Sequence, residues 1–391
     1  MTAMTPETTL PRPPAAMALA AFTSSVDRFG ISPLLVIIAV DFGVPLSAAV
    51  LTASVYFLTY GMTQPIWGML SDRFGRLPVM RVALAGALLC GMASAFAPTL
   101  GLLTLARAVT GAFFGAIIPA SITYLGDTTA PRHRQSALSD LMAAVAIGTA
   151  LATAAAGMLG QWLNWRVVFA LAAVLALVAL VPLLRLPEPD RDRSAGVLSS
   201  LRLFFAEKWS WVIMMLAFVE GALVLGILTL LAPALESQGI DTSLAGLAVA
   251  AYGVATLVCS RFVRRATAKL SAPRVLVLGG ICLVAGLATV AIHLSIVTVV
   301  LAALLLGGTW AFMHTGLQTW ATQVVPAARG ISVAFFAGAL FAGSAVSSAI
   351  AGTFAAAGQW TVIFGVGAAT AVVLTLAAAT GLSRYLSHRT T

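Results

Sequence analysis

Long apolar stretches alternate with short polar segments along almost the whole chain. A helix needs about twenty apolar residues to cross a bilayer, and at that length the pattern predicts twelve membrane-spanning helices. Six of them precede a charged stretch and six follow it. The predicted spans are 16–40, 47–70, 78–98, 100–126, 136–160, 164–185, 209–234, 243–266, 273–294, 296–323, 330–356 and 360–382.

The polar segments divide the chain into regions. The charged stretch, residues 186–208, is interpreted as a cytoplasmic linker between two six-helix halves, 16–185 and 209–382. Residues 1–15 are rich in proline and are predicted to form a disordered tail, and residues 383–391 are predicted to form a second, cytoplasmic tail. The first apolar run has no convincing cleavage site, which favours a retained helix over a signal peptide.

Composition agrees with this pattern. The chain is 60% hydrophobic and 9% charged, with a mean hydropathy of +1.01, whereas a soluble chain is about 25% charged. The fold class is therefore predicted to be an all-α membrane protein with twelve transmembrane helices in two pseudo-symmetric halves.

The net charge of +9 is explained by topology. Most lysines and arginines lie in the tails or in every second loop, which by the positive-inside rule places both termini in the cytoplasm. This distribution argues against nucleic acid as a partner and leaves the basic charge at most a minor role in holding anionic lipid.

The sequence contains no sign of a cofactor, a metal or an enzyme site. The three cysteines, Cys90, Cys259 and Cys282, are far apart and lie within predicted spans, so they form neither a metal-ligand spacing nor a disulfide framework. The sequence lacks a phosphate-binding loop, so ATP is not the expected energy source.

An internal repeat supports the division into halves. The run Trp165–Phe169 recurs as Trp360–Phe364 at an offset of 195, and at the same offset Gly148 falls on Gly343. Two parallel six-helix repeats would place a substrate cavity between the halves, near the middle of the membrane.

A short basic segment between the second and third predicted spans carries the most specific motif. Residues 65–81 read G-x-x-S-D-R-x-G-R-x-x-x-x-R, and this pattern resembles the loop between helices two and three of the major facilitator superfamily. The resemblance implies a gate at the cytoplasmic side, and the alternative is that these charges only fix topology. The predicted gating residues are Gly68, Asp72, Arg73, Gly75, Arg76 and Asp127.

Two further stretches resemble the same family. Residues 103–115, with Arg107, Gly111 and Gly115, are similar to the arginine-and-glycine motif of helix four. The glycines of helix five lie where drug:proton antiporters carry a glycine-rich motif, although its Gly-Pro pair is replaced by Gly157-Met158. Overall the chain is most similar to the twelve-helix drug:proton antiporters.

Four charged residues lie inside predicted spans, namely Asp27, Arg28, Arg107 and Glu220. Each costs roughly 2.5–3.5 kcal/mol at the centre of a helix on insertion scales, so each needs a reason. Asp27 with Arg107 is predicted to form a proton switch, while a static ion pair and direct binding of a cationic substrate stay open. Asp27 and Glu220 are counterparts at an offset of 193 and are expected to face each other across the cavity.

The other charges and the aromatic residues supply candidate cavity positions. Glu220 is either a proton or cation site or a packing partner, and Arg28 either contacts an anionic substrate or neutralises Glu220. Aromatic and polar residues share one face of helix ten and one face of helix two at i, i+4 spacing, which suits amphipathic ligands. The predicted cavity residues are Arg28, Tyr56, Tyr60, Gln64, Trp310, His314 and Gln318.

These observations predict a proton-coupled secondary transporter that exports small amphipathic, drug-like compounds by alternating access. The alternative is a proton-coupled symporter or exchanger of a small metabolite such as an organic anion. A receptor or scaffold is disfavoured, because it has no need to bear the insertion cost of buried charges. The expected partners are a small molecule, protons and lipid, and the expected form is a monomer in a bacterial inner membrane.

Overall fold

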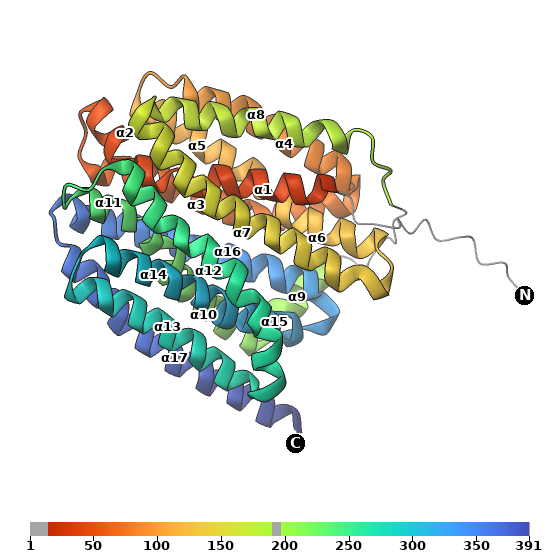
Figure 1. Cartoon of the computed structure of the whole chain (residues 1–391). Coiled ribbons are helices and arrows are strands. Elements are labelled where there is room, and N and C mark those ends of the chain that lie inside the picture. The colour runs from red at the N-terminus through yellow and green to blue at the C-terminus, as the bar shows by residue number, and fades with distance from the viewer. Residues whose placement is uncertain (1–14, 190–196, 391) are drawn as a thin grey trace, which may run out of the picture.

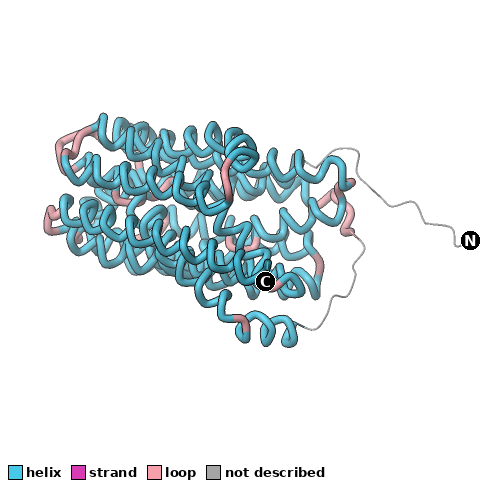
Figure 2. Tube along the Cα trace, turned by 90° about the horizontal axis from the view of Figure 1, so that it is seen from below, coloured by secondary structure: helices cyan, strands magenta, loops and turns pink. Residues whose placement is uncertain are grey.

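The computed structural model describes residues 15–189 and 197–390, and the predicted tail at residues 1–14, residues 190–196 of the linker and residue 391 lie outside them. Every regular element in the described ranges is a helix (Figure 2). Eleven stretches are long and apolar enough to cross a membrane. The fold class predicted from the sequence, an all-helical membrane protein, is therefore confirmed.

The N-terminal half is drawn in red to yellow-green in Figure 1. Its elements are α1 (Ala15–Phe29), η1 (Ser32–Leu34), α2 (Leu35–Phe42), α3 (Leu46–Phe74), α4 (Arg76–Ala95), α5 (Leu100–Phe114), α6 (Ile117–Thr128), α7 (Pro131–Trp162) and α8 (Trp165–Leu183).

The C-terminal half, green to blue in Figure 1, follows a short helix in the linker, α9 (Val197–Ala206). Its elements are α10 (Lys208–Gly221), η2 (Ala222–Gly226), α11 (Leu231–Glu236), α12 (Thr242–Lys269), α13 (Ala272–Ile292), α14 (Ile296–Thr309), η3 (Trp310–His314), α15 (Thr315–Val324), η4 (Pro326–Ala328), α16 (Arg329–Ala356) and α17 (Trp360–Thr390).

The first predicted span, 16–40, is not one continuous helix. The chain breaks after Phe29, passes through a 3-10 turn that contains Pro33, and resumes as α2. Proline lacks the amide hydrogen that an uninterrupted helix would use at that position. The segment is absent from the eleven candidate spans, so the count of twelve stays a prediction.

Three other segments differ from the sequence-based expectation. The predicted loop between the second and third spans is a single residue, because α3 continues to Phe74 and α4 begins at Arg76. Gly75 between them has φ +110°, a conformation that glycine adopts without the strain imposed by a Cβ atom. The linker contains α9, and α17 runs through most of the expected C-terminal tail.

The two halves meet mainly along two helix pairs, α3 with α16 and α7 with α12. Small residues line both contacts. A Cβ atom on Gly61 would meet the backbone of Gly338, and one on Gly246 would meet the backbone of Thr153 and Gly157. Small residues of this kind let helix backbones approach closely in membrane proteins.

Candidate functional site

A buried ion pair joins α1 to α5 in the N-terminal half. Arg107 Nη1 donates to Asp27 Oδ1 at 2.7 Å, and Nη2 donates to the backbone oxygen of Asp27 at 3.0 Å. Arg107 is fully buried and its guanidinium lies over the rings of Tyr56 and Phe169. The structure therefore brings together the two residues from which the sequence predicts a proton switch.

A second buried pair lies in the C-terminal half. Glu220, at the end of α10, places Oε2 3.2 Å from Nδ1 of His314, and Glu220 is fully buried. The imidazole stacks on Trp310 with ring centroids 3.7 Å apart. Asp27 and Glu220 therefore each have a partner within their own half, and the expectation that the two acids face each other across the cavity stays a prediction.

Both members of the second pair adjoin a π-helical turn. Glu220 lies just before η2, and His314 is the last residue of η3. A π-helical turn is rare and leaves local backbone groups in irregular positions, and such turns occur frequently at functional sites. Gly221 precedes the first of these turns and Gly226 is its last residue. The sequence nevertheless contains no pattern that distinguishes a π-helical turn from an ordinary helix.

Two repeat-related glycines hold the helices that carry the acids. A Cβ atom on Gly148 would meet the backbone oxygen of Phe22 on α1, and one on Gly343 would collide with the backbone oxygen of Phe218 on α10. Each glycine thus lets α7 or α16 press against the helix that bears Asp27 or Glu220. The offset of 195 between the glycines therefore corresponds to equivalent contacts in the two halves.

Arg28 differs from Arg107 because no described carboxylate forms an ion pair with it. It is 7% exposed, and its buried Nε has no hydrogen-bond partner among the described residues. Instead the guanidinium carbon lies 4.8 Å from the ring centroid of Phe29, 5.1 Å from that of Tyr60 and 5.5 Å from that of Phe341. The alternative that Arg28 directly neutralises Glu220 does not match these contacts.

The other predicted cavity residues lie on the second and tenth predicted spans, which are α3 and the α14–α15 segment of the structure. Tyr56, Tyr60 and Gln64 are buried, and the first two stack with centroids 6.0 Å apart. Neither tyrosine hydroxyl has a hydrogen-bond partner among the described residues. Trp310 and Gln318 are partly buried on either side of His314 along the chain.

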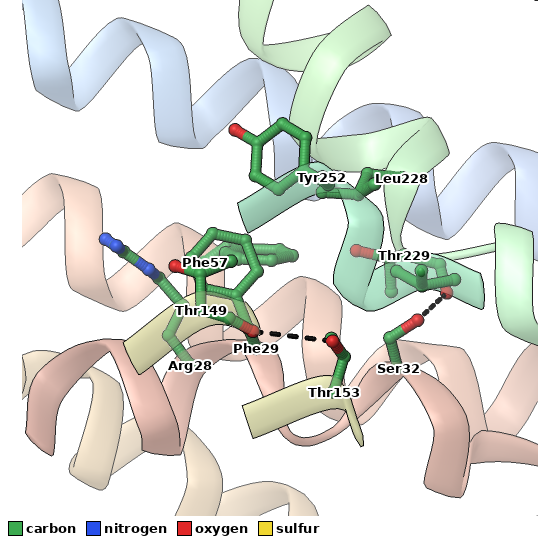
Figure 3. A pocket seen from close by; sticks show the side chains of 10 residues that line it. Arg28, Phe29, Ser32, Phe57, Thr149, Thr153, Leu228, Thr229 and Tyr252 are labelled. Carbon is green, nitrogen blue, oxygen red and sulfur yellow. Dashed lines mark hydrogen bonds between the residues drawn. The ribbon is translucent and has the colours of Figure 1, made fainter. Parts of the chain in front are cut away.

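A small cavity of about 10 Å³ lies between the halves, and Arg28 is among its lining residues. Figure 3 shows Arg28, Phe29 and Thr149 on one side of it and Tyr252 and Leu228 on the other. Pockets that hold drug-sized ligands are about 300–1,000 Å³, so the cavity is nearly closed in this conformation. Its lining residues come from α1, η1, α3 and α7 of one half and from α12 and the turn before α11 of the other.

Three hydrogen bonds between described residues link the halves. Ser32 Oγ donates to the backbone oxygen of Thr229 at 2.8 Å (Figure 3), and Ser54 bonds Ser348 through their hydroxyls. The backbone amide of Thr242 donates to the side chain of Gln161. All three lie toward the end of the bundle where α7 ends and α12 begins. The predicted gating residues lie at the other end, so we call this one the opposite end.

The other end of the bundle, which we call the basic end, carries the predicted gating residues. Arg76 forms ion pairs with Asp72 and, at 3.3 Å, with Asp127. Gly68, Asp72 and Arg73 belong to the last turns of α3 rather than to a loop. The Arg76 cluster joins elements of the N-terminal half only.

Glu188, in the linker, is an additional participant that the sequence did not indicate. Its carboxylate accepts hydrogen bonds from the backbone amides of Arg76 at 2.6 Å and Leu77 at 2.9 Å. The first amides of a helix have no acceptor within the helix, and a negative charge at that end is stabilised by the helix dipole. The linker is thereby fixed to the basic end beside the Arg76 cluster.

Sequence reasoning also missed Phe341 and Tyr252. Phe341 on α16 contacts the ring of Tyr60 across the boundary between the halves, and Tyr252 on α12 lines the cavity. The chain contains 19 phenylalanines, so no signal singled out Phe341. Tyr252, a polar aromatic residue in the middle of an apolar span, could have been proposed by the argument used for Tyr56. Among the described residues no group of metal-ligating side chains could hold a metal ion.

Comparison with known proteins places the chain in a family. The model of the Major Facilitator Superfamily matches residues 17–327, so the chain belongs to this superfamily of transporters. It shares 17% identity with a D-xylose-proton symporter of known structure, at a TM-score of 0.75 over 92% of this chain and 96% of the other. At that identity the likeness shows the fold alone.

Curated relatives match shorter stretches. A triacylglyceride transporter of Mycolicibacterium hassiacum is 34% identical over 39% of this chain and 30% of its own length. A 3-(3-hydroxy-phenyl)propionate transporter of Escherichia coli is 39% identical over 36% of this chain and 35% of its own. A puromycin resistance protein of Streptomyces alboniger is 34% identical over 36% of this chain and 28% of its own. The aligned stretches thus span about a third of these relatives.

Proposed function

We propose that this protein is a proton-coupled secondary active transporter that moves small amphipathic compounds by alternating access. The observation that carries the proposal is the presence of two buried carboxylates, one in each half, in a bundle that has a cavity at the boundary between the halves. Intramembrane acids paired with basic groups are typical of proton relays in transporters.

The Glu220–His314 pair is the better proton site of the two. Histidine changes charge near physiological pH, so a proton can reside on either partner. A proton on His314 makes the two groups an ion pair, and a proton on Glu220 makes both groups neutral. Glu220 Oε1 has no hydrogen-bond partner among the described residues, so the carboxyl can hold a proton without losing a contact.

Asp27 is more tightly constrained. Its partner Arg107 keeps its charge at any physiological pH, so Asp27 takes up a proton only after the guanidinium has moved away. A switch at Asp27 therefore requires a rearrangement between α1 and α5, which could accompany the motion of the halves. This role stays a prediction.

The contacts between the halves fit an alternating-access cycle. The three cross-half hydrogen bonds and the close glycine contacts would have to break for the opposite end to open. If the positive-inside rule holds, the basic end faces the cytoplasm of a bacterial inner membrane, with both termini on that side. We propose a monomer as the working unit, because each half supplies one wall of the cavity.

Two directions of transport remain candidates. Export is supported by the similarity to a protein named for puromycin resistance and by the motif resemblance. Uptake of a metabolite together with a proton is the second candidate, supported by the buried cation Arg28 and by the similarity to a protein named as a transporter of an aromatic acid.

The test is transport in proteoliposomes with an imposed pH gradient. We expect wild-type protein to drive accumulation of a substrate against its gradient and to move protons with it. Glu220→Gln should abolish pH-driven accumulation while leaving exchange of substrate between the two sides of the membrane. The control is Asp140→Asn, which neutralises an exposed carboxylate on α7 and leaves both buried pairs intact.

The same assay decides the role of Asp27. Loss of pH-driven accumulation in Asp27→Asn with retained exchange would support a switch there, whereas unchanged accumulation would leave Asp27 a structural partner of Arg107. Unchanged accumulation in both acid variants would overturn proton coupling through these pairs.

A further inference from the structure

Arg28 is a buried cation without an ion pair to any described residue. Its guanidinium is held between aromatic rings from α1, α3 and α16, and its Nε has no hydrogen-bond partner among the described residues. Ring contacts of this kind engage the faces of a guanidinium and leave the donors in its plane free. A buried charge in this state is costly unless a partner arrives.

We propose that Arg28 binds the negatively charged group of the transported compound, which is therefore an organic anion with an apolar or aromatic body. The inference rests on the proposed transport function and names the substrate class for the same site. The planar donors of arginine match the two oxygens of a carboxylate, and such charge-assisted bonds are stronger than neutral ones.

The surroundings of Arg28 suit the body of such a compound. Phe57, Leu228 and Val249 give the cavity apolar walls, and Thr149 and Tyr252 also line it. Arg28 and Phe57 come from one half and Tyr252 and Leu228 from the other, so a bound anion would contact both. A ligand in contact with both halves is positioned to influence their relative motion.

Charge balance in the membrane core links the anion to the proton. With Asp27 and Glu220 ionised and His314 neutral, the two acids balance Arg28 and Arg107. A proton on the Glu220–His314 pair then leaves one net positive charge, and an anion at Arg28 restores neutrality. Because each binding event favours the other, linkage predicts that proton and anion bind and move together, as in symport.

The groups around the Glu220–His314 pair support this balance. Tyr252 on α12 lies within electrostatic reach of both Arg28 and Glu220. The elements that pack against α10 are η2, α9, α15, α16 and α17. Neither η2 nor α15 contains a charged residue, and the charged residues of α9, α16 and α17 lie toward the basic end. Arg28 and His314 are therefore the basic groups that respond to the charge of Glu220.

The experiment compares three ligands of one shape. Purified full-length protein is titrated with 3-phenylpropanoate, its neutral amide and the corresponding propylammonium cation, and binding is followed by tryptophan fluorescence and thermal stabilisation. We expect the anion to bind at least about tenfold more tightly than the amide.

Arg28→Gln should weaken binding of the anion by roughly 10–100-fold and leave that of the amide unchanged. Arg28→Lys keeps the charge but loses the planar guanidinium, so its affinity for the anion should lie between those of the wild type and Arg28→Gln. Binding in this variant would also show that substitution at position 28 leaves the protein folded.

A matched control removes an arginine elsewhere. Arg265 lies over the ring of Phe262 on the exposed basic end of α12, and Arg265→Gln should bind the anion like the wild type. Because proton binding and anion binding favour each other, anion binding should be tighter at about pH 6 than at about pH 8. In Glu220→Gln, where the carboxylate is permanently neutral, this pH dependence should be weakened.

The outcomes separate the two proposals. Equal anion affinity in Arg28→Gln and wild type, preference for the cation or the amide, or failure of the anion to stabilise the wild type at millimolar concentration would each overturn the anion site. Proton-driven transport of cations would then leave the proposed function intact. Conversely, Arg28-dependent anion binding without any proton movement in proteoliposomes would retain the anion site and reject the proton coupling.

Discussion

Each half buries one acid on its first helix, and the two acids have different partners. Asp27 pairs with an arginine whose charge is permanent, and two N–H groups of Arg107 fix it. Glu220 pairs with a histidine through one contact beside two π-helical turns. A repeated architecture therefore carries two unlike electrostatic sites. The first is suited to holding helices together, and the second is suited to exchanging a proton.

The sharpest way to test this difference is to remove each basic partner in turn. Arg107→Gln leaves Asp27 buried and unpaired, and loss of one partner of a buried ion pair costs about 3–5 kcal/mol. His314→Gln should cost less, because His314 makes one contact to Glu220, whereas Arg107 donates two hydrogen bonds to Asp27 and packs against two aromatic rings. Thermal unfolding in detergent measures both changes.

The control for Arg107→Gln is the double variant Asp27→Asn/Arg107→Gln, which removes both charges and should recover part of the lost stability. Equal destabilisation by Arg107→Gln and His314→Gln would show that the two pairs are equivalent, against the distinction drawn here.

The next effect concerns how closely each acid-bearing helix is packed. Gly343→Ala puts a methyl group on the backbone oxygen of Phe218, and Gly148→Ala puts one beside the backbone oxygen of Phe22 with slightly more room. Overpacking of a tight contact costs about 1–3 kcal/mol. We expect both variants to unfold at lower temperature, Gly343→Ala by the larger margin.

The control is Gly365→Ala on α17, because no atom lies near the position of its added methyl group. A loss of stability in Gly365→Ala as large as that in Gly343→Ala would mean that helix–helix approach is not the cause.

The difference between the pairs also explains how far the sequence could predict the site. The partnership of Asp27 with Arg107 could be predicted, because both are charges inside apolar spans and the family motif marks the arginine. The partnership of Glu220 with His314 spans 94 residues and depends on two π-helical turns that have no sequence signature. Arg28 was recognised as unusual, but its three aromatic neighbours come from separate helices and required the structure. The helical fold itself followed from apolar run length alone.

An exposed ion pair at the basic end extends the comparison to a weaker site. Asp72 is half exposed in its pair with Arg76, and exposed pairs contribute about 0–1 kcal/mol. Asp72→Asn should therefore change stability little, yet slow the transport turnover without greatly changing substrate affinity if the Arg76 cluster acts as a gate. Rates and affinities from the proteoliposome assay separate these effects, and a collapse of affinity with normal turnover would contradict the gating role.

The smallest effect is expected at the opposite end, where Asp41 accepts hydrogen bonds from Arg166 at 2.7 Å and from the indole of Trp165 at 3.0 Å. These donors, Arg166 first, lower the pKa of Asp41 below its ordinary value of 3.8. The stabilisation is therefore present above that value and lost only as the pH falls through the lowered pKa.

Because the carboxylate is 41% exposed, Asp41→Asn should cost less than about 1 kcal/mol. The difference in unfolding temperature between variant and wild type should be the same at about pH 5 and about pH 8. A difference that changes between those two pH values would show that Asp41 titrates there, which would contradict a lowered pKa of Asp41.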